Sequence, residues 1–195
     1  MFEPGIVLEG GSIEVNGGGI VLTTEQCLLN RNRNPQLGRQ EIEEYLKEYL
    51  NIRQVLWLKE GIAGDDTDGH IDDIARFVDE KTVVCVVEED RSDENYEILK
   101  ENYDRLQGLI PNVIPLPMPG YIGDRDARLP ASYANFYIGN ETVVVPIFGH
   151  SHDNRALKII EECFPTRRVV GVHATAMVHG LGTIHCCSQQ EPRNR

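Results

Sequence analysis

The sequence predicts an α/β fold in which one strand–strand–helix–strand unit occurs three times. Three stretches carry apolar residues at helical spacing, and their helices are expected to begin near residues 39, 95 and 153, at almost constant intervals. Each helical stretch follows two strand-like runs and precedes a further short apolar run. Regular recurrence of one supersecondary unit is typical of repeat architectures.

The first unit is expected to contain two strands, a helix and a third strand. These elements are expected at residues 5–10, 19–24, 38–50 and 54–58. One stripe of the helix is apolar or aromatic and comprises Ile42, Tyr45, Leu46, Tyr49 and Leu50. A stripe at this spacing predicts one buried helix face.

The second and third units repeat this order. The second is expected at residues 75–78, 82–87, 95–106 and 112–116, and the third at 134–138, 142–148, 153–164 and 168–172. Asp153 is the expected N-cap of the third helix. One more strand-like stretch, "GLGTIHCC" over residues 180–187, follows where a fourth unit would begin.

The composition of the chain argues against several classes of protein. Of its 195 residues, 41% are hydrophobic and 26% charged, which is ordinary for a globular protein. The net charge of −12 disfavours nucleic-acid binding and suits a cationic ligand. No apolar run of about 18 residues predicts a membrane span, and the N-terminus does not resemble a signal peptide. The five irregularly spaced cysteines therefore suggest reduced thiols in a cytoplasm.

Unusual polar residues stand at the start of each unit. Glu9 lies in the first expected strand, His70 and Asp72 open the second unit, Asn135 opens the third, and Cys186 opens the incomplete fourth. Equivalent positions in a ring of repeats meet at one axis. A carboxylate, an imidazole, an amide and a thiol that converge there would form a candidate active site.

The His-x-Asp pattern is a weak signal alone, because it is more often a surface loop. Here it follows the acidic stretch "GDDTDG" at the point where the sequence becomes apolar. Residues two apart in an extended segment share a face, so Asp72 is expected beside His70. A neighbouring carboxylate favours the imidazolium form, which a general acid requires.

The stretch "GLGTIHCC" offers two thiols after a glycine-rich turn. On an extended segment Cys186 and Cys187 point in opposite directions, so only one faces the axis and the other packs as a small hydrophobic residue. Gly182 would let a ligand approach the backbone closely. A vicinal disulfide, or a zinc site with His185, is the competing chemistry. No second ligand pair has zinc spacing, so we expect no metal.

Five stretches together resemble agmatine deiminases and the bacterial-type peptidylarginine deiminases. They are "LEGGS", "CLLNRNRNP", "TDGHID", "ASYANF" and "GTIHCCSQQEP". The resemblance extends from about residue 5 to residue 192. It implies a pentein propeller, which has five ββαβ modules around a central site. Residues 1–195 would then be a partial domain, an incomplete ring of about three modules and the start of another, without the N-terminal modules.

The resemblance also implies a role for each site residue. Cys186 would be the nucleophile, His70 the general acid and base, and Asp72 a carboxylate that holds a guanidinium group. Glu9 would pair with the histidine and the substrate, while Asn135 and Gly182 would line the substrate site. Leu181 and Thr183 depart from the family pattern "GGGNIHC", and the family's N-terminal "W-x-R-D-x-G-P" motif is absent.

The implied activity is hydrolysis of agmatine to N-carbamoylputrescine and ammonia through a covalent thiouronium, without cofactor. Arginine or peptidyl-arginine are alternative substrates. The expected partners are the cationic guanidine and the N-terminal half or another protein chain, with neither nucleic acid nor membrane. A different possibility is an inactive remnant that acts as a binding or folding partner. We expect little agmatine hydrolysis from these 195 residues alone.

Overall fold

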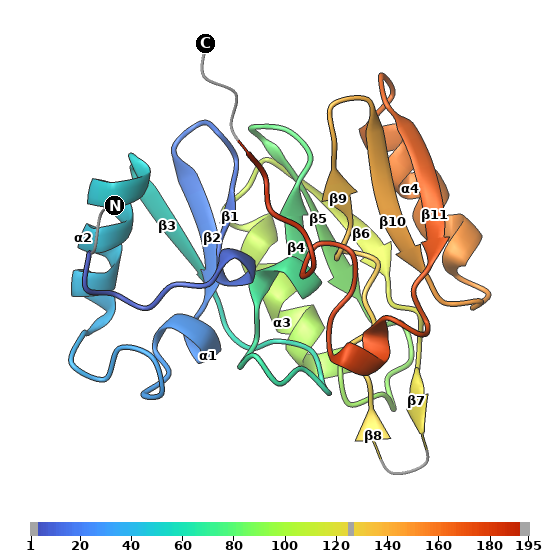
Figure 1. Cartoon of the computed structure of the whole chain (residues 1–195), viewed down its shortest axis with the longest axis horizontal. Coiled ribbons are helices and arrows are strands. Elements are labelled where there is room, and N and C mark those ends of the chain that lie inside the picture. Colours follow the sequence, from blue (N-terminus) through green and yellow to red (C-terminus); the bar gives the residue numbers. More distant parts are fainter. Residues whose placement is uncertain (1–3, 125–126, 192–195) are drawn as a thin grey trace.

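Three small mixed sheets with the same strand order form the fold (Figure 1). The computed structural model describes residues 4–124 and 127–191. In each sheet the central strand pairs antiparallel with the strand before it and parallel with the strand that follows the helix. The predicted order of strand, strand, helix and strand is therefore confirmed in all three units.

The long helices and the second and third strands of each unit lie close to their predicted bounds, whereas the first strands of the first and third units do not. The first unit comprises β1 (Glu14–Val15), β2 (Ile20–Thr24), the short α1 (Glu25–Leu28), α2 (Arg39–Leu50) and β3 (Gln54–Leu58). The second comprises β4 (Ala75–Phe77), β5 (Thr82–Val87), α3 (Tyr96–Gln107) and β6 (Asn112–Pro117). The third comprises β9 (Tyr137–Ile138), β10 (Thr142–Ile147), α4 (Asp153–Cys163) and β11 (Arg168–His173). The hairpin of β7 (Gly123–Asp124) and β8 (Ala127–Arg128) lies between the second and third units.

The apolar stripe of α2 is narrower than predicted. Ile42 and Leu46 are buried against the first sheet, whereas Tyr49 and Leu50 are exposed. Tyr45 stacks on Tyr49 with the ring centroids 6.1 Å apart. The two aromatic side chains thus cover each other near the helix surface and stay out of the core. Among the described residues, no helix is both long and apolar enough to cross a membrane.

A buried ion pair joins the three units. The Nε of Arg76 on β4 donates to Glu14 Oε2 on β1 at 2.8 Å, and Phe77 N donates to Glu14 Oε1 at 2.9 Å. Arg76 Nη1 also donates to the carbonyl oxygens of Ala134 and Phe136, just before β9. Side chains from the first two units and the backbone of the third therefore meet at one guanidinium group.

The strand predicted over residues 5–10 is wrong. The first strand is β1, and a single turn of 3₁₀-helix over Gly10–Ser12 precedes it. Ser12 N and Ser12 Oγ both donate to the carbonyl oxygen of Glu9, at 3.1 and 2.6 Å, which curls the chain there. Glu9 therefore lies directly before this turn and not in a strand.

The extended conformation predicted for "GLGTIHCC" is also wrong. Val178–Gly180 forms a turn of 3₁₀-helix, and Thr183 to Cys187 form a second turn. Cys187 N donates to Thr183 O at 3.2 Å, the i to i−4 pattern of an α-helical turn. The thiols of Cys186 and Cys187 therefore follow one another around a turn and do not alternate across a strand.

Asp153 does not cap α4 as predicted, because it is the first residue of that helix and His152 occupies the N-cap position. Its carboxylate accepts hydrogen bonds from the amides of Phe148, Gly149 and His150 and from the hydroxyl of Tyr133. The side chain thus orders the polar turn before the helix.

Candidate active site

The turn that carries Cys186 is held by one buried amide. Asn135, from the loop before β9, accepts at its Oδ1 from Thr183 Oγ1 at 2.8 Å, from His185 N at 2.9 Å and from Cys186 N at 3.3 Å. Its Nδ2 donates to Cys186 Sγ at 3.1 Å. Asn135 therefore fixes both the backbone of the turn and the position of the thiol.

Asp72 lies beside this thiol and is fully buried. Its Oδ2 contacts Asn135 Nδ2 at 3.1 Å, His185 Nδ1 at 2.7 Å and Cys186 Sγ at 3.5 Å. Its Oδ1 is buried without a hydrogen-bond partner among the described residues. A buried carboxylate oxygen without a donor is costly, so Oδ1 marks a place for a ligand N–H group.

Asp73 adds a second buried carboxyl group at the same place. One oxygen of Asp73, one of Asp72 and the Sγ of Cys186 all lie within 4.8 Å of one another. Burial, and then the neighbouring charge of Asp72, raise the pKa of Asp73 well above its ordinary value of 3.8. Asp73 therefore holds its proton over a wider pH range than an exposed aspartate.

The environment of Cys186 disfavours the thiolate. Cys186 and Cys187 are both exposed as residues, so the predicted packing of Cys187 is wrong. Loss of hydration around the Cys186 sulfur, together with the charges of Asp72 and Asp73, raises the pKa of this thiol from 9.0 to about 12. A cation beside the sulfur would act in the opposite direction and favour the thiolate.

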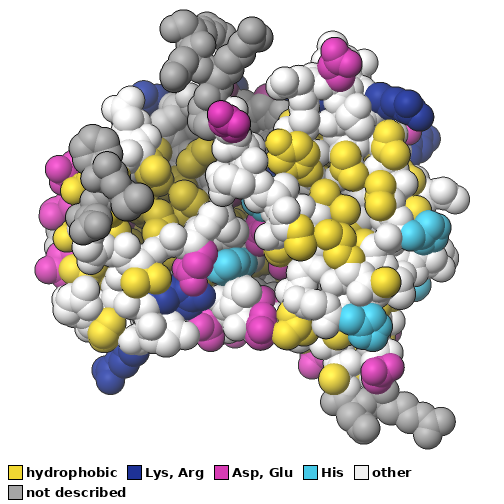
Figure 2. All heavy atoms as spheres, in the orientation of Figure 1, with side chains coloured by type: hydrophobic (Ala, Val, Ile, Leu, Met, Phe, Trp, Pro, Cys, Tyr) yellow, Lys and Arg dark blue, Asp and Glu magenta, His cyan; other side chains and the backbone are white. Residues whose placement is uncertain are grey.

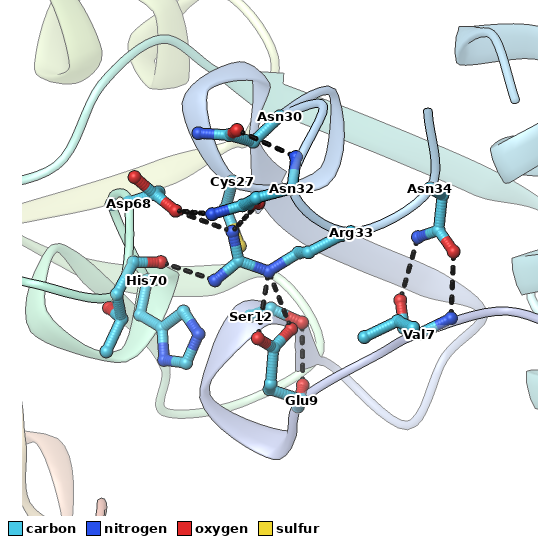
Figure 3. Close-up of polar contacts among 12 residues, drawn as sticks. Val7, Glu9, Ser12, Cys27, Asn30, Asn32, Arg33, Asn34, Asp68 and His70 are labelled. Carbon is cyan, nitrogen blue, oxygen red and sulfur yellow. Dashed lines mark hydrogen bonds and ion pairs between the residues drawn. The ribbon is translucent and has the colours of Figure 1, made fainter. Parts of the chain in front are cut away.

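A second polar cluster surrounds His70 (Figure 3). The Nε of Arg33 donates to both carboxylate oxygens of Glu9, at 2.8 and 2.9 Å. Arg33 Nη1 donates to Asp68 Oδ2 at 2.9 Å, and Nη2 donates to the carbonyl oxygen of Thr67 at 2.6 Å. The Arg33 side chain is 7% exposed, and its guanidinium group fixes Glu9 relative to the acidic loop that leads to His70.

That acidic loop is ordered by its own side chains. Asp65 Oδ1 accepts from the amide of Thr67 at 2.8 Å, and Asp65 Oδ2 accepts from the amides of Gly69 and His70 at 2.7 and 3.2 Å. One oxygen of Glu9, the sulfur of Cys27 and one ring nitrogen of His70 lie within 4.8 Å of one another. His70 Nε2 is buried without a partner among the described residues. The imidazole thus keeps a nitrogen available for proton transfer.

Gly11 separates the two clusters and contacts both. A Cβ added at Gly11 would lie 2.6 Å from His70 Nδ1 and 3.1 Å from each oxygen of Asp72. The side chains of His70 and Asp72 are therefore neighbours across one glycine. Asp72 reaches this position within the 3₁₀ turn Ile71–Asp73 and not, as predicted, along an extended segment.

The structure brings the predicted site residues into two adjoining groups. Glu9 lies with His70, and Asp72 lies with Asn135 and Cys186. A Cβ on Gly182 would lie 2.8 Å from the Cβ of Cys186, so this glycine packs against the thiol residue. Each group includes three side chains that could bind a metal: Glu9, Cys27 and His70 in one, and Asp72, Asp73 and Cys186 in the other.

Sequence reasoning gave no role at the site to Arg33 or Asp73, and it named His185 only as a possible zinc ligand. Arg33 lies in the motif "CLLNRNRNP", His185 directly precedes Cys186, and Asp73 directly follows Asp72. A basic residue within a motif, far in sequence from any predicted carboxylate, was the only available signal for Arg33. For His185 and Asp73 the signal was adjacency to a predicted site residue.

Comparisons with known proteins agree over nearly the whole chain. Residues 1–192 match the family model of the Porphyromonas-type peptidyl-arginine deiminases. A putative agmatine deiminase of Latilactobacillus sakei is 42% identical over 214 residues, which cover 97% of this chain and 59% of that protein. The crystal structure of a putative arginine deiminase from Porphyromonas gingivalis superposes with a TM-score of 0.94 at 44% identity, over 97% of this chain and 58% of that one.

A third relative is known with its substrate. The C315S variant of the C. jejuni agmatine deiminase, with substrate bound, superposes with a TM-score of 0.92 at 37% identity, over 94% of this chain and 56% of that one. The chain thus spans less than two thirds of the length of each of these three relatives.

Proposed function

The chain belongs to the Porphyromonas-type peptidyl-arginine deiminase family, and we propose that it carries the catalytic cysteine of an agmatine deiminase. The observation that supports this most directly is the pairing of Cys186 Sγ with Asp72, whose Oδ1 is buried without a donor. A guanidinium N–H would complete the hydrogen bonding of that oxygen. The guanidinium carbon would then lie beside the sulfur.

In the proposed reaction Cys186 first passes its thiol proton to His70. The bound cation lowers the cost of forming this thiolate, which the carboxylates otherwise raise. The sulfur then attacks the guanidinium carbon, and His70 returns the proton to the departing amino group. The C–N bond breaks, ammonia is released, and a thiouronium remains on Cys186. Water attacks this carbon with His70 as base, which releases N-carbamoylputrescine and regenerates the thiol. Glu9, held by Arg33, orients His70.

We also propose that the three units are modules of a pentein propeller and that further modules complete the site. In support, the relatives are longer than this chain. Figure 2 shows hydrophobic side chains gathered over β9, β10 and β11, and Val172, Met177 and Leu181 are exposed in this part of the molecule. Such a patch is typical of a surface that another module or protein covers. A carboxylate from those modules would hold the guanidinium from its second side.

Two alkylating reagents of similar size test the proposed site. At pH 7, 2-chloroacetamidine carries the charge and planarity of a guanidinium, whereas 2-chloroacetamide has the same leaving group and is neutral. We expect the amidine to label Cys186 in preference to Cys187, and chloroacetamide to label Cys186 slowly because the pKa of this thiol is about 12. Peptide mapping by tandem mass spectrometry locates the label, and Cys186→Ala is the control. Labelling of Cys186 by the amidine no faster than by chloroacetamide would contradict the proposed function.

Ammonia release tests the contribution of the remaining modules. The chain alone is expected to turn over agmatine well below about 1 s⁻¹, because one-sided clamping misorients the carbon. Addition of the N-terminal modules of a relative should restore turnover that Cys186→Ala abolishes. Turnover at or above about 1 s⁻¹ by the chain alone would show that Asp72 suffices.

A further inference from the structure

His185 contacts Asp72, the carboxylate that we propose binds the substrate. Its Nδ1 is 2.7 Å from Asp72 Oδ2, and the two side chains are 10% and 0% exposed. A carboxylate only accepts hydrogen bonds, which assigns the proton of the imidazole to Nδ1. His185 therefore donates to Oδ2, and not to Oδ1, which has no partner among the described residues.

The two oxygens of Asp72 have different surroundings. Oδ2 receives donors from two separate elements, His185 on the Cys186 turn and Asn135 before β9. Oδ1 has no partner among the described residues. A quarter-turn of the carboxylate about its Cβ–Cγ bond would break both hydrogen bonds, whereas a half-turn exchanges two equivalent oxygens and restores them. The two donors thus fix the plane of the carboxylate and leave one of its oxygens for a further donor.

We propose that His185 is a positioning residue that orients Asp72 for binding of the guanidinium group. The inference rests on the proposed function, since it assumes that Asp72 binds that group. His185 also connects binding to attack, because it is adjacent to Cys186 on a turn whose backbone Asn135 holds. Loss of the imidazole would let the carboxylate rotate while the turn keeps its hydrogen bonds through backbone N–H groups.

Three substitutions separate this role from a general packing role. In His185→Asn, the side-chain amide nitrogen can occupy the place of Nδ1 and donate to Asp72. In His185→Gln, the amide nitrogen falls nearer the place of Nε2, away from Asp72. His185→Ala removes the donor altogether. His179, exposed on the preceding 3₁₀ turn, provides the matched control as His179→Ala.

The readout is the rate of Cys186 labelling by 2-chloroacetamidine divided by the rate with 2-chloroacetamide, measured on the same protein. We expect His185→Ala and His185→Gln to lower this ratio about 10- to 100-fold, which corresponds to loss of a hydrogen bond to a charged group. The lower ratio should arise mainly because a higher concentration of the amidine is needed to reach half of the maximal labelling rate. His185→Asn should recover most of the ratio, and His179→Ala should leave it unchanged.

Three results would overturn the proposal, and they are distinguishable. A wild-type ratio near one would contradict the proposed function itself. A normal wild-type ratio that His185→Ala leaves unchanged would show that Asp72 needs no help from His185. An equal loss of labelling with both reagents in all three variants, including His185→Asn, would show that His185 only supports the turn.

Discussion

Two buried carboxylates near the start of units, Glu14 and Asp72, differ in how completely their oxygens are bonded. Glu14 Oε1 and Oε2 accept from Phe77 N and Arg76 Nε, so both oxygens have donors. Asp72 Oδ2 has donors from His185 and Asn135, whereas Oδ1 has none among the described residues. Both residues are less than 10% exposed, so burial alone does not distinguish them.

The difference teaches where to look for a ligand. Glu14 has its hydrogen bonding completed within the chain and is paired with Arg76, so it helps to hold the units together. Asp72 is just as buried, but its Oδ1 has no donor among the described residues and can accept a hydrogen bond from a ligand. Breaking the pair of Glu14 with Arg76 should therefore lower stability, whereas neutralising Asp72 should weaken ligand recognition and leave stability almost unchanged.

The largest effect is expected at the fastened carboxylate. Arg76→Met leaves Glu14 buried without its cation and should destabilise the chain by about 3–5 kcal/mol. Urea denaturation followed by circular dichroism measures this change. Arg155→Met, which removes the exposed ion pair with Glu89, is the control and should cost about 1 kcal/mol or less. If Arg76→Met lowered the free energy of unfolding as little as Arg155→Met does, the ion pair of Arg76 with Glu14 would not hold the units together.

At the incompletely bonded carboxylate, recognition should be lost while stability is kept. In Asp72→Asn the amide oxygen can still accept from His185 and Asn135, so the denaturation midpoint should change little. Labelling of Cys186 by 2-chloroacetamidine should fall about 100-fold, because the charge that attracts the amidinium is gone. If Asp72→Asn unfolded at as low a urea concentration as Arg76→Met, Asp72 would be a structural carboxylate like Glu14, which would contradict this comparison.

The smallest effect is expected at Asp73 and depends on pH. Its pKa in the folded chain is raised above 3.8, so the unfolded chain ionises first as the pH rises and stability falls across that interval. Asp73→Asn removes this loss and should raise Tm at pH 7 by about 2–4 °C, as about 1 kcal/mol does in a chain of this size. The gain should vanish at about pH 2.8, one unit below the ordinary value of 3.8, where both states carry the proton. The exposed Asp66→Asn is the control, and an equal gain at both pH values would contradict this account.

Periodic burial explains why so much of the fold could be predicted. The strands at 54–58 and 82–87 and the three long helices bury one face or both, and apolar spacing records that directly. The turns at Glu9 and at Cys186 produce no such periodic spacing of apolar residues in the sequence. Hydrogen bonds hold them, within three residues at Glu9 and across about 50 positions from Asn135 to Cys186.

The sequence suggests candidate site residues but not the contacts that they make. Glu9, His70, Asp72, Asn135 and Cys186 stand in recognisable motifs at the starts of units. The pairings of Arg33 with Glu9 and of His185 with Asp72 join segments 24 and 113 positions apart. Spacing along the chain has no bearing on such pairs, so they require the folded molecule.

The absence of a side chain at Gly11 has an evolutionary consequence. The imidazole of His70 and the carboxylate of Asp72 both lie within about a van der Waals contact of the point where any other residue would place its Cβ. The spacing between the imidazole of His70 and the carboxylate of Asp72, which we propose transfer protons and bind the substrate, therefore cannot be adjusted by a small substitution at this position. A lineage that adapts to a bulkier or differently shaped ligand would have to change its specificity at the outer parts of the site, while this inner spacing stays constant.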